Sequence, residues 1–218
     1  MRARQLAAQN VFREQDGVAA FGFRSRRIVI NTNLLPLTKA PHSLQELTNQ
    51  AWRGKVALAY PQFGTTSAHF HALRQYWGSI NWETWCDALA ANKPQLVDGN
   101  SVVVKTVGRG DALVGLTDSD DIAAGQEEGQ PIAPLPLTPE SLLIPNTIAV
   151  VRNCRHPDEA QRLFEYLRQP AVTERLIAAK ALEGAPSGNA TLPLKINWDR
   201  LLADLNTTTE TLNKIFLR

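Results

Sequence analysis

The chain has 218 residues, of which 44% are hydrophobic and 20% charged, and its formal net charge is +2. This length and composition are typical of a folded protein with a sizeable core, in one or two domains. The small net charge gives no signal for nucleic acid or a membrane surface, so we expect no nucleic-acid partner.

The first 25 residues are the least regular part of the sequence, and we expect a loose N-terminal segment there. They contain neither the apolar core of a secretory signal nor a membrane-spanning run. Basic residues cluster from the start of the chain to position 27 without the interleaved aromatic residues of single-strand binders, so we interpret their side chains as solvent-facing. The cluster comprises Arg2, Arg4, Arg13, Arg24, Arg26 and Arg27.

A first strand is predicted at residues 27–30. A capping-box pattern, Ser43 with Glu46 three residues later, predicts a short helix at 43–47. Residues 55–60 form a short apolar run typical of a buried strand. Apolar spacing then predicts helices at about 66–78 and 81–91.

The turn between that strand and the first of these helices is a candidate anion site. The first turn of a helix presents N–H groups that lack an intrahelical partner and carry partial positive charge. Gly64 permits a tight turn, and Thr65, Thr66 and Ser67 add hydroxyl donors. The alternative is that Thr65 or Thr66 only caps the helix.

Two further turns have the same character. Residues 97–101, with Asn100 and Ser101, precede a predicted helix at 102–107. Residues 114–121, with Thr117, Asp118 and Asp120, precede one at about 119–128. Because ligands of open α/β sheets bind beyond the carboxyl ends of strands, we expect the three turns to converge around one pocket.

The remaining segments continue an α/β pattern. The proline-rich residues 131–145 are predicted to be extended, and residues 147–151 to form a strand. A helix beginning near His156 is followed by one from Pro170 to about Lys180, and a single long helix is predicted at 198–216.

Other residues leave alternatives open. Cys86 and Cys154 could form one disulfide or remain reduced thiols. His69 and His71 lie two apart on a predicted helix, a spacing that points them away from one another and disfavours a shared metal. No nucleophile elbow, phosphate-loop lysine or zinc-protease motif is present, so we expect the protein not to be an enzyme.

Taken together, these segments resemble the periplasmic solute-binding proteins of ABC importers, in the group that includes the ferric-ion-binding proteins. The resemblance covers roughly residues 22–218. The matching segments are WRGKVA (52–57), FGTTS (63–67), DGNSV (98–102), GLTDSDD (115–121), IPNT (144–147) and HPDEA (156–160).

The resemblance implies a type II binding-protein fold, in which two α/β lobes close on a ligand. The second lobe would be present with part of the first, and most of the first lobe would be absent. Residues 1–25 would be the loose segment, 26–145 the lobe carrying most of the site, 146–192 a piece of the other lobe, and 193–218 a C-terminal helix rejoining the main lobe.

The resemblance also implies the function. The chain would be a monomeric periplasmic or extracellular component that captures a small anionic or metal-containing solute by lobe closure and delivers it to an ABC permease in the membrane. The ligand-binding positions carried over are Thr65, Thr66, Ser67, Asn100, Ser101, Thr117, Asp118 and Asp120.

The identity of the solute stays open. Ferric-binding relatives place adjacent tyrosines where this chain has residues 117–121, and that pair is missing here. A bound metal ion such as iron(III) would therefore depend on hard carboxylate donors, for which Asp118 and Asp120 are candidates. The alternatives are a metal-dependent hydrolase that uses Asp118 and Asp120, or a truncated fragment that binds nothing.

Overall fold

The computed structural model describes residues 18–183 and 194–217. The loose N-terminal segment expected at 1–25 lies outside the described residues as far as position 17. Residues 18–25 are part of the first strand, which begins at Val18 and not at position 27. The prediction of a loose segment is therefore wrong for residues 18–25, because they pair with a strand more than 100 residues away along the chain.

The described strands form one mixed sheet, which confirms the predicted α/β class. They are β1 (Val18–Asn31), β2 (Val56–Ala59), β3 (Gln95–Val97), β4 (Val114–Asp118), β5 (Ile132–Pro134) and β6 (Leu143–Ala149). The order is β3-β2-β4-β1-β5, with β6 pairing β1 off this path. Strand β2 is parallel to β3 and β4, whereas β1 is antiparallel to β4, β5 and β6.

The helices follow the predicted order. They are α2 (Gly64–Trp77), α3 (Ser79–Ala91), α4 (Asn100–Arg109), α5 (Ser119–Glu127), α6 (Pro157–Leu167), α7 (Pro170–Ala178), α8 (Trp198–Ala203) and α9 (Leu205–Phe216). The short helix predicted at 43–47 is a 3-10 helix that begins at Gln45.

The single helix predicted at 198–216 is wrong, because α8 and α9 are separate and meet at Asp204. The Asp204 carboxylate accepts a hydrogen bond from Arg74 of α2 at 2.9 Å, and its backbone leaves the helical conformation there. A contact with another element thus interrupts a sequence pattern that is locally helical.

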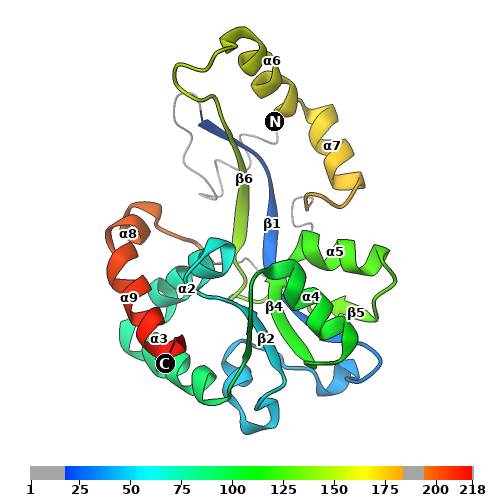
Figure 1. Cartoon of the computed structure of the whole chain (residues 1–218), viewed down its shortest axis with the longest axis vertical. Coiled ribbons are helices and arrows are strands. Elements are labelled where there is room, and N and C mark those ends of the chain that lie inside the picture. The colour runs from blue at the N-terminus through cyan, green and yellow to red at the C-terminus, as the bar shows by residue number, and fades with distance from the viewer. Residues whose placement is uncertain (1–17, 184–193, 218) are drawn as a thin grey trace.

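Alternation along the strands places helices on both faces of the sheet. Ile28, Ile30 and Leu58 face a large buried cluster with aromatic side chains of α2 and α3. Val29 and Ala57 face a smaller cluster supplied mainly by α4 and α5. Each large apolar side chain buried in this way contributes about 2 kcal/mol to folding. The result is a three-layer lobe in which helices cover both faces of β2 and β4 (Figure 1).

A two-stranded ribbon leaves this lobe. The first part of β1 pairs with β6, from Val18 opposite Ala149 to Ser25 opposite Leu143. Helices α6 and α7 lie at the far end of that ribbon, while α8 and α9 return beside α2 and α3 (Figure 1). Within the described ranges, none of the helices combines the length and apolarity required to cross a bilayer.

The end of β1 is held by one buried amide. The Asn31 side chain is 2% exposed; it donates to the Val107 carbonyl at 2.7 Å and accepts from the Asn33 and Leu34 N–H groups at 3.0 and 3.1 Å. We expect Asn31→Ala to lower the free energy of unfolding by about 2 kcal/mol, since the buried Val107 carbonyl loses its donor and two backbone N–H groups lose their acceptor. Urea denaturation measures the change. The exposed Asn33→Ala serves as control and should shift stability by less than about 0.5 kcal/mol.

Candidate functional site

The three strand-to-helix turns meet at one edge of the sheet, which confirms their predicted convergence, whereas a pocket around them stays a prediction. Thr65 lies in the first turn of α2, Asn100 begins α4, and Asp118 ends β4 just before α5. The Thr65 hydroxyl donates to Asp118 Oδ2 at 2.8 Å. The Asn100 amide donates to Thr65 Oγ1 at 2.9 Å and to Asp118 Oδ2 at 3.2 Å. The N-termini of three helices therefore converge on one carboxylate.

A buried ion pair lies beneath this junction. Arg26 stands directly opposite Asp118 in the β1–β4 register. Its side chain is fully buried, and its Nη1 group donates to Asp118 Oδ1 at 2.8 Å and to Asn100 Oδ1 at 2.7 Å. Its Nη2 group donates to the Leu116 carbonyl at 3.2 Å. Nη1 also donates to Thr65 Oγ1 at 3.5 Å, so one guanidinium bonds to all three turns.

A second arginine reaches the same carboxylate from two positions earlier on β1. Arg24 Nε donates to Asp118 Oδ2 at 2.9 Å, and its Nη1 group donates to Asn146 Oδ1 on β6 at 2.9 Å. The Arg24 side chain is 23% exposed, so it links the buried pair to solvent and to the ribbon.

The prediction that these arginines face solvent is wrong for Arg24 and Arg26, which bind Asp118, and for Arg27, which binds Glu183 at 2.9 Å. These are the functional candidates that the sequence reading missed. The available signal was the spacing of two between Arg24 and Arg26, which places both on one face of an extended strand.

Of the other predicted site residues, some bond to this cluster and others do not. Thr66 is buried and lies 3.5 Å from Asn100 Oδ1, and the buried Thr117 hydroxyl donates to the Asn100 carbonyl at 3.1 Å. Ser67 is buried and has no side-chain bond to this cluster among the described residues, and Ser101 is exposed at the start of α4. Asp120 lies 3.7 Å from Arg24 Nε.

The carboxylates of this edge differ in their protonation. Burial alone would raise the pKa of Asp118, but the Arg26 charge and hydrogen bonds from Arg26, Arg24 and Thr65 hold it below its ordinary value. Burial and the neighbouring carboxylates of Asp120 and Asp118 raise the pKa of Asp121 to about 6. Asp118 is therefore a fixed anion, whereas Asp121 titrates close to neutrality.

The same carboxylates form the candidate metal cluster. Ligand atoms of Asp118, Asp120 and Asp121 lie within 4.8 Å of one another. However, Asp118 Oδ2 already accepts from Arg24, Thr65 and Asn100, and Asp118 Oδ1 accepts from Arg26. Direct coordination of a metal by Asp118 would have to displace these donors. Asp118 therefore orients the arginine, threonine and asparagine side chains around it and is poorly suited to binding a metal ion.

The histidines and cysteines lie outside this junction. His69 is fully buried, with Nε2 2.6 Å from the Glu140 carbonyl. Of the two states left open for Cys86 and Cys154, the structure has both as free thiols. Burial raises the pKa of the Cys86 thiol, so it is protonated and unreactive at neutral pH.

Comparison with known proteins gives one family and one fold. The family described as "Bacterial extracellular solute-binding protein" matches residues 3–179. No curated protein sequence matches the chain. Among solved structures, iron-bound HitA from Pseudomonas aeruginosa has a TM-score of 0.77 at 18% identity, over 96% of this chain and 74% of that one.

Two further structures are similar. The Trichodesmium protein IdiA (FutA) in complex with iron and citrate has a TM-score of 0.73 at 16% identity, over 95% of this chain and 72% of that one. The apo ferric ion-binding protein A of Pasteurella haemolytica has a TM-score of 0.76 at 15% identity, over 94% and 71%. The likeness establishes the type II periplasmic binding-protein fold and confirms the predicted family resemblance.

The buried pair provides a stability prediction. Asp118→Asn keeps the side-chain shape but leaves the Arg26 charge buried without a counter-ion, so we expect the free energy of unfolding to fall by about 3–5 kcal/mol. Urea denaturation measures it. The matched control is Asp111→Asn, which breaks an exposed 2.9 Å pair with Arg109 and should cost less than about 1 kcal/mol. Equal losses would contradict the role of burial.

The raised pKa of Asp121 provides a pH prediction. Its ordinary value is 3.8 and its folded value about 6, so the native state holds this proton more tightly than the unfolded chain does. Ionisation therefore removes stability as the pH rises from about 4 through 6. Asp121→Asn should therefore raise the free energy of unfolding more at about pH 7.5 than at about pH 3.5. Denaturation at both pH values measures this, and an identical effect at both would contradict it.

Proposed function

We propose that this chain, which belongs to the bacterial extracellular solute-binding protein family, is the solute-binding component of an ABC-type importer that captures a small organic anion. The observation that carries the proposal is the convergence of the N-termini of α2, α4 and α5, held together by hydrogen bonds among Thr65, Asn100 and Asp118.

The convergent helix ends supply the attraction for an anion. The first-turn N–H groups of each helix have no intrahelical acceptor and carry partial positive charge. Arg24 adds a partly exposed guanidinium beside them. Because Asp118 neutralises the buried Arg26, the positive groups left for a ligand are the helix N–H groups and the partly exposed Arg24 guanidinium, which suit reversible capture of a carboxylate or phosphate group.

Acceptors at the same edge narrow the class of solute. Asp120 and Asp121 lie in the first turn of α5 and can accept hydrogen bonds from hydroxyl groups. A hydroxycarboxylate or a sugar phosphate carries both kinds of group. A metal would arrive as a chelate of such an anion, since the donors on Asp118 disfavour direct coordination. The same saturation disfavours a metal-dependent hydrolase that uses Asp118.

The proposal includes the division into lobes. Residues 26–145 together with 193–218 would form the lobe that carries the site, and residues 146–192 a part of the other lobe. Asn146, which bonds to Arg24, would lie at the boundary and couple solute binding to lobe closure. The partner would be a membrane permease, and the protein would act as a monomer in the periplasm or outside the cell.

A thermal-shift panel tests the proposal. The probes are citrate, ferric citrate, glucose 6-phosphate, inorganic phosphate and spermidine. We expect an organic anion to raise the melting temperature, because a ligand at a hundredfold excess over Kd stabilises the native state by about 2.7 kcal/mol. Spermidine should have no effect. If none of the probes stabilises the protein, the result supports the alternative of a fragment that does not bind.

Paired variants localise the effect. Arg24→Gln removes the accessible guanidinium and should weaken binding of the stabilising anion by about tenfold or more. Arg109→Gln, which removes an exposed arginine at the end of α4, is the control and should leave the affinity unchanged. Titration calorimetry gives both affinities. Equal affinities for the two variants would place the anion elsewhere.

A further inference from the structure

Helices α6 and α7 are held to the lobe at two places. The first is the β1–β6 ribbon, which runs from the sheet to these helices (Figure 1). The second is the short segment at residues 180–183, where the chain returns from the end of α7 to β1. Within the described ranges, neither α6 nor α7 packs extensively against α2, α3, α4 or α5. The position of the two helices relative to the lobe therefore depends on the ribbon and on this segment.

The returning segment packs along the ribbon. The buried Leu182 side chain lies over Gly22 of β1, so close that a Cβ on that glycine would clash with the leucine methyl carbons. The Glu183 N–H donates to the Phe23 carbonyl at 2.8 Å. These contacts bring the Glu183 side chain to the point where β1 leaves the ribbon and enters the sheet.

The Glu183 carboxylate joins the ribbon to the sheet. Its Oε1 atom accepts from the Ser25 hydroxyl at 3.0 Å and from Arg27 Nη2 at 2.9 Å. Ser25 is the last residue of β1 that pairs with β6, whereas Arg27 pairs with Thr117 of β4. Arg27 Nε also donates to Ser25 Oγ at 2.7 Å, which closes a ring of three hydrogen bonds. One side chain from the end of α7 thus holds both parts of β1.

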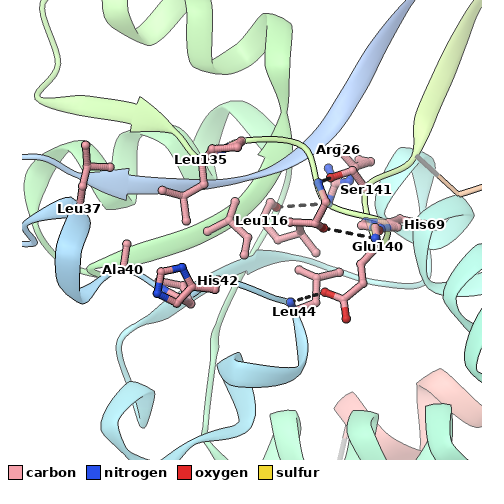
Figure 2. Close-up of a pocket in the computed structure, with 14 residues that line it drawn as sticks. Arg26, Leu37, Ala40, His42, Leu44, His69, Leu116, Leu135, Glu140 and Ser141 are labelled. Carbon is pink, nitrogen blue, oxygen red and sulfur yellow. Dashed lines mark hydrogen bonds between the residues drawn. The ribbon is translucent and has the colours of Figure 1, made fainter. Parts of the chain in front are cut away.

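This ring of hydrogen bonds lies on the opposite face of β1 from the buried ion pair. Arg26 lines the pocket drawn in Figure 2, on the face of the sheet that packs against α2 and α3. Because side chains alternate along a strand, Ser25 and Arg27 point to the other face, which carries α4 and α5. The Ser25 N–H donates to the Ser119 hydroxyl at the start of α5 at 3.0 Å. The ring is therefore bonded, through Ser25, to a helix that supplies one of the convergent turns.

The ion pair in this ring is partly buried. Ser25 is fully buried, while the Arg27 and Glu183 side chains are 19% and 23% exposed. A pair at this depth is screened less than a surface pair, and its hydrogen bonds are charge-assisted. Water can still reach both ions when they separate, so opening the ring leaves neither charge buried without a partner. The pair can therefore both hold and release.

A second ion pair joins the same two parts of the molecule at the surface. Lys180 Nζ, just beyond α7, lies 3.4 Å from Glu127 Oε1 at the end of α5, and the two side chains are 57% and 59% exposed. An ion pair this exposed contributes little, because solvent screens it and both side chains lose freedom when they pair. It therefore provides a matched control for the partly buried Glu183.

We propose that Glu183 acts as a latch, which fixes the orientation of α6 and α7 relative to the lobe while its carboxylate is bound to Ser25 and Arg27. When the carboxylate is released, Leu182 and the Glu183 N–H stay attached to the ribbon, so the two helices follow the ribbon and are no longer tied to the sheet. Parts of a chain joined through a small contact area move relative to one another. The latch operates without a solute, so it does not depend on the proposed transport function.

A pair of spin labels in the full chain tests the latch. The labels are attached through Glu159→Cys on α6 and Lys105→Cys on α4, both at exposed positions. Cys154→Ser removes the other accessible thiol, and the buried Cys86 is left in place. This labelled protein is the parent for the comparison. Pulsed dipolar spectroscopy gives its distribution of distances between the two labels, with no solute added.

We expect Glu183→Ala to widen this distribution by about twofold or more, because α6 and α7 lose their tie to the sheet. Glu127→Ala, which breaks only the exposed pair with Lys180, should leave the width as in the parent. An unchanged width in Glu183→Ala, or an equal change in both variants, would overturn the proposal.

A further variant releases the latch from the other side. Should Glu183→Ala fail to fold, as judged by circular dichroism, Arg27→Gln removes the guanidinium that binds the carboxylate and should widen the distribution in the same way. A folded Arg27→Gln protein with the parent's width would contradict the latch. Because the measurement uses no solute, its result stands whether or not any probe of the thermal-shift panel binds.

Discussion

The buried pair between Arg26 and Asp118 is the interaction on which the rest of the site depends. Removing a guanidinium and a carboxylate from water costs several kcal/mol for each ion, and only close pairing with additional hydrogen bonds offsets that cost. Here the bonds come from Thr65, Asn100 and Arg24. The same hydrogen bonds hold the three turns together and replace the water lost by the ion pair. Displacing any one turn would therefore leave a buried ion without some of its partners.

This arrangement explains how a site can attract anions while containing three aspartates. The Asp118 carboxylate is paired with Arg26 and Arg24, so its charge is already compensated within the protein. Asp120 and Asp121 lie at the start of α5, where backbone N–H groups favour negative charge, although burial raises the pKa of both carboxyl groups. The donors that remain available, Arg24 and the helix N-termini, determine the sign of the solute.

Much of the lobe could be predicted from sequence, because its signals are local. The strand at 55–60 and the starts of α2, α4 and α5 follow from apolar spacing and turn residues, and so does the convergence of their ends. The pairing of Arg26 with Asp118 depends on a β1–β4 register that joins residues 92 positions apart. The break at Asp204 depends on Arg74 in another element. Neither is encoded in a local window of sequence.

The continuous strand β1 has a mechanical consequence. Its later part is clamped in the sheet by β4 and β5, and its earlier part pairs with β6, with the register irregular between Ala20 and Gly22. Because the two strands are paired, this connection is stiffer than a glycine-rich linker would be. A change in the position of α6 and α7 relative to the lobe would therefore have to be accommodated by twist of these two strands.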